Sequence, residues 1–234
     1  NPAVFVPGYV PRPAELEAMT GHLDIRIFTQ PSEWYCQLWR GHLGDRVQPM
    51  FVPIILEDWP DLSAEPKTHD VVIYDKIRWH RDEMVPRILD RMQDHLRRRG
   101  LSAVTLRYGD HKLADFRAAL RGGRAMIFLC EHETQGLAYQ EAMASGIPVL
   151  AWNEGVLVDP EERRLAPEGL FAPSVPYFDD RCGMTFTEAT LEPALDRFQA
   201  ALPGFDPRSY VAETLNAERS ARAYLDLLDR AAQI

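Results

Sequence analysis

Short apolar runs alternate with longer amphipathic segments through the middle of this chain. Runs typical of buried strands lie at residues 71–74, 104–107, 125–129 and 148–151. Segments typical of helices lie between them, at residues 83–99, 110–121 and 135–145. Strands that alternate with helices over short connections form parallel sheets with helices on both faces. The sequence therefore predicts an α/β fold with a Rossmann-like parallel sheet.

Residues at the expected helix ends agree with these boundaries. Gly100 and Gly146 follow two of the helical segments, and glycine is the residue that most often ends a helix. Pro86 lies near the first turn of its helix, where proline is tolerated. Asp110 is a good N-cap for the helix after the second strand.

The region before the alternation has a different pattern. Residues 1–22 are proline-rich, and residues 24–29 are typical of a short strand. Ser32 is a good N-cap for a helix that follows this strand. Prolines interrupt the next apolar run, residues 47–55, and the acidic stretch 57–68 is typical of a linker.

Three further helical segments form the end of the chain, at residues 192–202, 207–215 and 217–232. In the last of them, Ala221, Leu225 and Leu228 lie on one side. This pattern predicts that the C-terminal helices pack back onto the domain.

Charge and composition exclude several classes of protein. A net charge of −9 argues against a nucleic-acid surface, because duplex binding needs a basic stripe. We find no signal peptide and no apolar stretch near the roughly 20 residues of a membrane span. The histidines lack metal-site spacing, and the cysteines do not form a disulfide or zinc framework. The three cysteines are Cys36, Cys130 and Cys182. We therefore expect a cytoplasmic protein without a bound metal.

The segment ETQGLAYQEAMASGIPV, residues 133–149, follows the third strand. Its helix begins near Gly136, and the unpaired N–H groups and dipole of a helix start attract anions, phosphate above all. Glu133 precedes the helix, and Glu141 lies about five residues into it, roughly 7 Å along its axis. This separation is too large for one acid–base dyad. It suits an extended ligand that has hydroxyls at both ends and an anion between them, although acids at a helix start also simply stabilise the dipole.

The longer pattern resembles the E-x7-E signature of glycosyltransferase family 4, whose members have the GT-B fold. The residues that match are Glu133, Gly136, Leu137, Glu141 to Ala144, Gly146, Pro148 and Val149. The resemblance extends weakly over residues 24–234. It implies that Glu133 contacts the donor sugar and that Glu141 holds the nucleotide ribose, so we expect both side chains to face a solvent-filled pocket. It also implies that substrate meets the turn made by Thr134, Gln135, Gly136 and Leu137.

The family neutralises the donor diphosphate with an arginine and, five residues on, a lysine. The matching positions here carry Lys76 and Arg81, with the residue types exchanged, and Asp75 replaces the usual glycine before them. Arg78 is a competing candidate. Fixed cations stabilise charge that develops on a leaving diphosphate, so Lys76 and Arg81 join Glu133 as expected catalytic residues. Tyr108, after the second strand, is expected either under the base or in packing.

A GT-B enzyme has two Rossmann-like domains with the reaction in the cleft between them. By resemblance, residues 1–30 are a remnant of a first domain or a linker, residues 31–215 bind the donor, and residues 216–234 form a C-terminal helix. The implied activity is hexosyl transfer, with retention of configuration, from a nucleotide-diphosphate sugar to an unknown acceptor, without a cofactor. This chain then supplies mainly the donor-binding half.

Other interpretations remain open. The alternatives are an inactive nucleotide-sugar-binding module, and a GT-B-like sugar-nucleotide epimerase or phosphate-binding Rossmann domain that uses the same helix end. A dinucleotide dehydrogenase is disfavoured because no G-x-G-x-x-G follows the first strand. The donor sugar, the base and the oligomeric state do not follow from the sequence.

Overall fold

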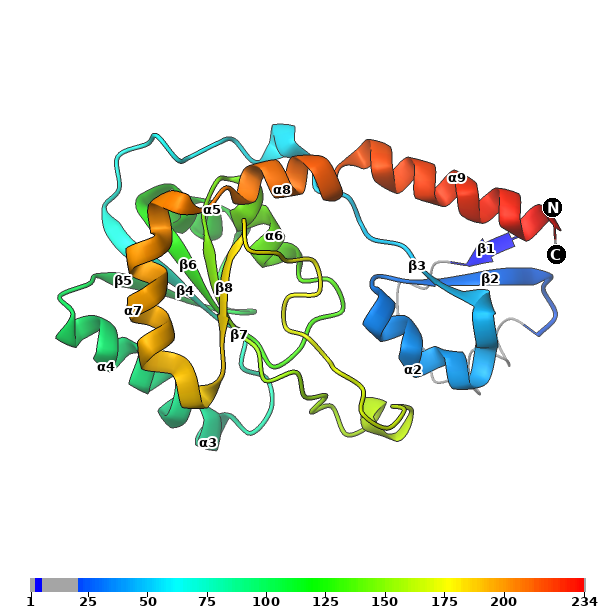
Figure 1. Ribbon diagram of the computed structural model, residues 1–234, viewed down its shortest axis with the longest axis horizontal. Helices are drawn as coiled ribbons and strands as arrows, with labels where there is room; N and C mark the ends of the chain where they lie inside the picture. The colour runs from blue at the N-terminus through cyan, green and yellow to red at the C-terminus, as the bar shows by residue number, and fades with distance from the viewer. Residues whose placement is uncertain (1–2, 6–20, 234) are drawn as a thin grey trace.

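The computed structural model describes residues 3–5 and 21–233, and these form two parallel sheets (Figure 1). The smaller sheet has the order β1-β2-β3, with β1 at Ala3–Phe5, β2 at Ile25–Gln30 and β3 at Val47–Pro49. Helix α2 (Glu33–Leu43) connects β2 to β3. The division expected after residue 30 therefore falls inside this small unit, because α2 and β3 follow it.

The larger sheet has the order β5-β4-β6-β7-β8. Its strands are β4 (His69–Asp75), β5 (Ala103–Arg107), β6 (Gly123–Leu129), β7 (Val149–Trp152) and β8 (Gly183–Phe186). The first four confirm the predicted strands, whereas β8 was not predicted. The chain passes from β4 to β5 at one edge and then returns to β6 on the other side of β4. Such a reversal opens a crevice at the carboxyl ends of β4 and β6, where ligands bind in folds of this type.

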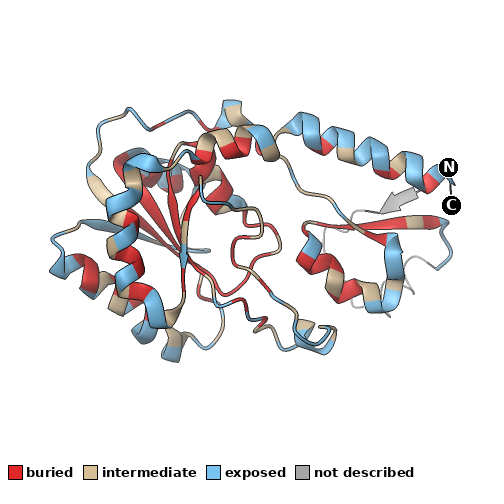
Figure 2. Cartoon of the chain, in the orientation of Figure 1, coloured by how far each residue is buried: buried red, intermediate tan, exposed pale blue. Residues whose placement is uncertain are grey.

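Alternate residues of the central strands enter two different cores, which lie on opposite faces of the sheet (Figure 2). On one face, Tyr74 and Phe128 pack with α5 (Leu113–Gly122), α6 (Leu137–Ala144) and α8 (Pro207–Thr214). On the other face, Ile73 and Ile127 pack with α4 (Arg91–Arg98) and α7 (Leu191–Ala201). The strands therefore read as continuous apolar runs because both faces are buried.

The helix predicted at residues 83–99 is divided in the structure. It consists of α3 (Arg81–Met84), a π-helical segment (Val85–Asp90) and α4. Because the helix begins at Arg81, Pro86 is its sixth residue and lies beyond the first turn. Proline has no N–H to donate and its ring collides with the carbonyl four residues earlier. A wider π turn accommodates that lost hydrogen bond.

Helix α5 begins later than predicted, so Asp110 is not its N-cap. Residues 108–111 form a turn in which Gly109 has φ +88°. Lys112 is the residue before the helix, and its N–H donates to the Asp115 carboxylate at 2.9 Å. The glycines expected to end helices, Gly100 and Gly146, do adopt the left-handed conformation, with φ +70° and +76°.

The C-terminal helix α9 (Ala217–Gln233) extends from the main sheet to the small one (Figure 1). The Arg26 guanidinium donates to the Ala231 carbonyl at 3.0 Å, and both Leu227 and Ala231 are buried. The predicted face was wrong, since Leu225 is 58% exposed. Apolar residues lie on more than one side of this helix, so its sequence pattern does not identify the buried side. Contact with the small sheet determines which side is buried. No described helix is long and apolar enough to cross a membrane.

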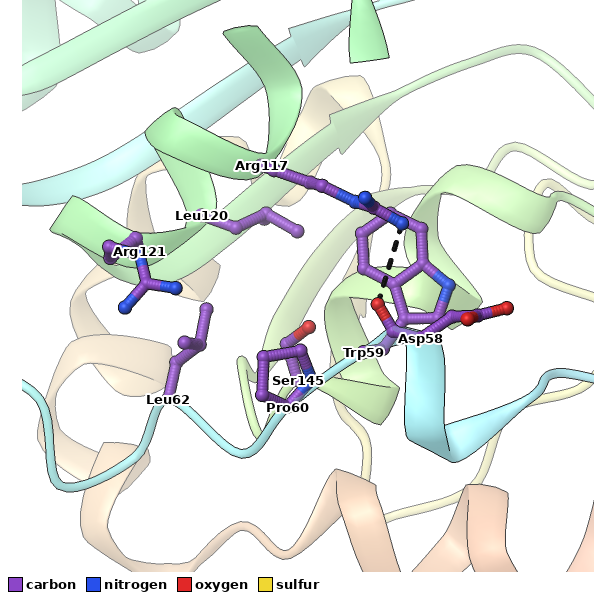
Figure 3. A pocket seen from close by; sticks show the side chains of 8 residues that line it. All are labelled: Asp58, Trp59, Pro60, Leu62, Arg117, Leu120, Arg121 and Ser145. Atoms are coloured by element: carbon purple, nitrogen blue, oxygen red, sulfur yellow. Dashed lines mark hydrogen bonds between the residues drawn. The ribbon is translucent and has the colours of Figure 1, made fainter. Parts of the chain in front are cut away.

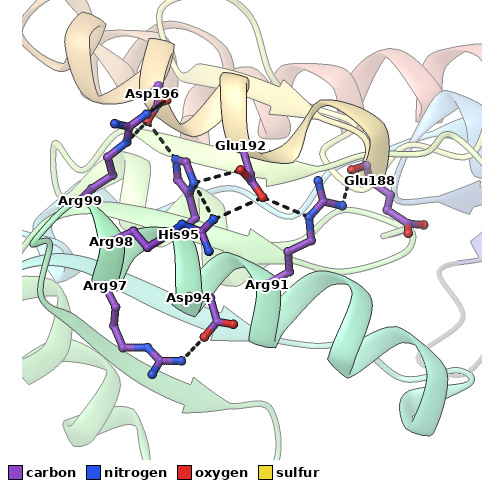
Figure 4. A network of polar contacts seen from close by, with 9 residues as sticks. All are labelled: Arg91, Asp94, His95, Arg97, Arg98, Arg99, Glu188, Glu192 and Asp196. Carbon is purple, nitrogen blue, oxygen red and sulfur yellow. Dashed lines mark hydrogen bonds and ion pairs between the residues drawn. The ribbon is translucent and has the colours of Figure 1, made fainter.

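Opposite charges join α4 to α7 on the outer face of the molecule (Figure 4). The Arg99 Nε atom lies 2.9 Å from Asp196 Oδ1, and His95 Nε2 lies 3.0 Å from the same oxygen. The Arg91 Nη1 atom donates to the Glu188 carbonyl at 3.1 Å. These contacts lie around the edge of the apolar contact between the two helices and orient one on the other.

Candidate functional site

Side chains from three neighbouring strands meet at the crevice. The N–H of Lys76 donates to the Leu129 carbonyl at 2.8 Å, so the chain after β4 stays beside β6. The Lys76 ammonium forms an ion pair with the Glu133 carboxylate, and these two side chains are only 14% and 8% exposed. The ammonium also lies 4.5 Å from the centroid of the Tyr108 ring, after β5. The structure therefore brings together three residues that the sequence predicted for the site.

Contacts from distant parts of the chain hold Glu133 in place. Its N–H donates to the Pro173 carbonyl at 3.0 Å, and its carbonyl accepts from Trp34 Nε1 at 2.9 Å. The Cys130 thiol lies 3.5 Å from its Oε1 atom. The expectation that Glu133 faces a solvent-filled pocket is wrong, because the side chain is buried against Lys76.

The turn before α6 depends on glycine. Gly136 has φ +83°, which favours glycine, and a Cβ atom here would lie 2.2 Å from the ring of Tyr139. The first N–H groups of α6 follow directly at the crevice. Leu137 is exposed and Thr134 is half-buried, so both are accessible from solvent.

The side chain of Gln135 has a structural contact. Its Nε2 atom donates to the Val52 carbonyl at 2.6 Å, and its Oε1 atom accepts from the Val52 N–H at 2.7 Å. Gln140 Nε2 donates to the Gln135 carbonyl at 3.0 Å. The Gln135 side chain thus holds the segment after β3 against α6, which leaves its backbone N–H as the group that can meet a ligand.

Arg81 is engaged by Asp75, the last residue of β4. Its Nη1 and Nη2 atoms lie 3.0 and 2.7 Å from the two oxygens of Asp75, which is buried. This pairing raises the pKa of Arg81 above its ordinary value. Asp75 also accepts from the N–H of Ile77 at 3.1 Å. Arg81 therefore shapes the loop after β4, and in this structure it does not contact Glu133.

Glu131 joins the loop after β4 to the loop after β6. Its Oε1 atom accepts the N–H groups of Arg78 and Trp79, both at 3.0 Å. Burial raises the pKa of Glu131, and the two N–H groups oppose that rise. The sequence reasoning missed this residue, although an acidic side chain at the end of a buried strand was a usable signal.

Other side chains of the loops after β4 and β6 stack on one another. The Arg78 guanidinium lies 4.2 Å from the Trp79 ring centroid and donates to the His132 carbonyl at 3.0 Å. The His132 ring stacks on Trp79 with centroids 4.8 Å apart. Burial lowers the pKa of His132 to about 4, and its Nε2 atom has no hydrogen-bond partner among the described residues.

Glu141 lies one to two turns into α6 and is half-buried. Burial raises the pKa of Glu141 to about 7, and the charge of Arg117 opposes that rise. Arg117 itself lies 4.8 Å from the Trp59 ring centroid and donates to the Asp58 carbonyl at 3.4 Å (Figure 3). A cavity of about 50 Å³ beside Arg117 has room for little more than water. Within residues 21–233, no hydrogen bond or ion pair is seen at the Glu141 carboxylate.

Metal-binding side chains are not grouped in the described part of the chain: no three His, Cys, Asp or Glu residues there are placed to hold an ion. Its cysteines are buried free thiols.

No protein-family model and no curated protein matches this sequence. Solved glycosyltransferase structures do match. Sucrose-phosphate synthase from Thermosynechococcus elongatus has a TM-score of 0.59 at 14% identity, over 93% of this chain and 61% of that chain. A glycosyltransferase from Rickettsia africae ESF-5 has a TM-score of 0.58 at 11% identity, over 98% and 70%. The catalytic domain of starch synthase IV from Arabidopsis thaliana, bound to ADP and acarbose, has a TM-score of 0.58 at 14% identity, over 90% and 56%.

This chain spans about half the length of other structures that it matches, 48% for the GtfA/B complex and 46% for TarM. At identities this low, the likeness shows the fold alone. The chain therefore has the Rossmann-like α/β architecture of GT-B glycosyltransferases.

Proposed function

We propose that this chain is the donor-binding part of a retaining glycosyltransferase of family 4, which transfers a hexosyl group from a nucleotide-diphosphate sugar. The observation that carries the proposal is the Lys76–Glu133 pair in the crevice, beside the start of α6. Glu141 stands farther along the same helix with a free carboxylate. An acid, a cation with a helix N-terminus, and a second acid are suited in turn to the sugar, the diphosphate and the ribose.

In the proposed reaction, an oxygen of the acceptor bonds to C1 of the sugar while the bond from C1 to the diphosphate oxygen breaks. The electron pair of that bond stays on the diphosphate, and the hydroxyl proton of the acceptor passes to the leaving phosphate. The transition state has oxocarbenium character, as in other glycosyl transfers. Lys76 and the N–H groups of α6 stabilise the charge that develops on the diphosphate. This scheme needs neither a protein nucleophile nor a metal ion.

In this scheme Lys76 changes its ion-pair partner when the donor binds. Without ligand, its ammonium neutralises the buried carboxylate of Glu133. A diphosphate brings a second anion to the same ammonium, so Glu133 becomes free to accept hydrogen bonds from the sugar hydroxyls. In this scheme Arg81 acts by shaping the loop through Asp75, and the exposed Arg78 supplies additional positive charge.

Calorimetric titration with nucleoside diphosphates tests this assignment. UDP and ADP are the first probes, because a TarM variant from S. aureus was solved with UDP and starch synthase IV with ADP. We expect Lys76→Ala to weaken binding by about tenfold or more, since a charge-assisted contact to phosphate is lost. Lys112→Ala, at an exposed position before α5, is the matched control and should bind as the wild type does.

Equal binding by Lys76→Ala and wild type would contradict the donor site. With a nucleotide sugar that binds, product analysis then separates transfer from epimerisation. A chain that binds the donor and releases no product would match the binding-module alternative.

A further inference from the structure

A second cavity, of about 280 Å³, lies at the carboxyl ends of β6 and β7. Of its lining residues, Trp152 belongs to the core that α4 and α7 form, and Met84 packs against that core. The cavity is therefore on the face of the sheet opposite α6. Much of its wall is apolar, with Val156 and Val158 completing it from the loop after β7. Small-molecule sites have this character, mostly apolar with a few placed polar groups.

The polar groups of the cavity are mainly acidic. Arg87 is neutralised by Glu188, whose Oε1 atom lies 2.9 Å from Arg87 Nε. Glu131 and Glu154 then remain as the carboxylates of the wall without an ion pair among the described residues, and Glu154 Oε1 accepts the Trp152 indole N–H at 2.9 Å and the Glu188 N–H at 2.5 Å. Glu131 is 5% exposed and accepts bonds of 3.0, 3.0 and 3.3 Å. A carboxylate has about four acceptor positions, so Glu131 keeps capacity for a donor inside the cavity.

The backbone at the cavity wall is strained. His80 is the only described residue other than glycine with a positive φ, +50°. It lines the cavity between Trp79 and α3. Such conformations concentrate at ligand sites, where the surrounding structure maintains them.

The cavity shares its loops with the candidate donor site. Trp79 and Glu131 line the cavity, and they lie three residues after Lys76 and two residues before Glu133. The hydrogen bond from the Trp79 N–H to Glu131 connects these loops directly. A molecule in the cavity would thus be a neighbour of a donor bound at the crevice.

We propose that this cavity binds a hydroxyl-bearing group of the acceptor, such as a sugar ring, either uncharged or carrying an amine. The proposal rests on the proposed function. Apolar walls suit the C–H faces of a sugar, and carboxylates accept hydrogen bonds from its hydroxyls. The surplus of carboxylates disfavours phosphate-bearing molecules, whereas Lys76 favours them. The two neighbouring sites therefore differ in whether they accept an anionic ligand, which directs donor and acceptor to different places.

NMR of the ¹⁵N-labelled 234-residue chain tests this proposal through the indole N–H signals of Trp79 and Trp152, assigned with Trp→Phe variants. The probes are methyl α-glucoside, glucosamine and glucose 6-phosphate. We expect the first two to shift both signals, and glucose 6-phosphate to bind more weakly, on the order of threefold or more, because of like-charge repulsion. Val156→Trp should fill the cavity and remove the shifts. Val104→Trp, on the exposed edge strand β5, should keep them.

Calorimetry with UDP separates this proposal from the donor assignment. UDP binding should survive Val156→Trp and fall in Lys76→Ala, while the sugar-induced shifts should survive Lys76→Ala. Absent shifts with methyl α-glucoside and glucosamine, or shifts that persist in Val156→Trp, would overturn the cavity proposal and leave the donor site intact. Sugar-induced shifts in a chain that binds no nucleotide would overturn the acceptor role.

Discussion

The molecule carries two dense groups of opposite charges, and they differ in burial. In the group between α4 and α7, the side chains of Arg99 and Asp196 are 54% and 39% exposed. In the crevice, Lys76 and Glu133 are almost completely covered. Exposed pairs are screened by water and contribute little, whereas buried charges are costly unless each is matched. We infer that the exposed group orients two helices, while the buried pair persists at the crevice because a ligand needs those charges.

The largest expected effect is on the free energy of unfolding. It concerns Asp75, the last residue of β4 and the neighbour of Lys76 in the sequence. Asp75→Ala leaves the Arg81 guanidinium and the Ile77 N–H without their buried partner. We expect a loss of about 3 kcal/mol in the free energy of unfolding, measured by urea denaturation. Asp196→Ala in the exposed group is the matched control and should cost clearly less. Equal losses would show that burial does not distinguish the two groups.

A smaller effect concerns ligand affinity. Glu133→Gln removes the anion that competes with a diphosphate for Lys76, and it keeps the shape of the side chain. UDP should therefore bind more tightly by about 1 kcal/mol, roughly fivefold, while a nucleotide sugar that binds should lose its advantage over UDP. Glu192→Gln, in the exposed group, should leave both affinities unchanged. Weaker UDP binding by Glu133→Gln would show that the pair does not compete with phosphate.

The smallest effect is a dependence on pH. Burial raises the pKa of Glu141 to about 7 from 4.5, so its stabilising contribution is full below pH 4.5 and is lost as the pH rises through 7. After allowance for its partial exposure, this loss is about 1 kcal/mol. In the proposed site the ionised carboxylate accepts hydrogen bonds from ribose, so UDP binding should strengthen from pH 6 to pH 8. Glu141→Gln should flatten both profiles, and an unchanged profile in that variant would assign the titration to another group.

The sequence predicted the strands correctly where both faces of the strand are buried. Strands β4, β6 and β7 each contain an unbroken run of four or five buried apolar residues, at 71–74, 125–129 and 149–152, so their sequences alone identify them. Strand β8 has four residues after a long irregular segment and carries no comparable signal. The buried side of α9 was mispredicted because a distant sheet selects it.

The sequence named residues for the candidate site, but it did not predict the contacts between them. The family pattern marks Lys76, Glu133 and Glu141, but the sheet order decides which of them touch. Two partners were missed for the same reason, since the Asp75–Arg81 pair and the Glu131 contacts both depend on how the loops after β4 and β6 meet. Asp75 stands where the family that the sequence resembles carries glycine, and its carboxylate holds Arg81 in this structure.

A crystal structure of the chain soaked with UDP tests the central claim most directly. The account predicts a diphosphate between the Lys76 ammonium and the first N–H groups of α6, with the ribose hydroxyls at Glu141. A UDP molecule bound elsewhere, or a crevice still closed by the Lys76–Glu133 pair at saturating UDP, would contradict it.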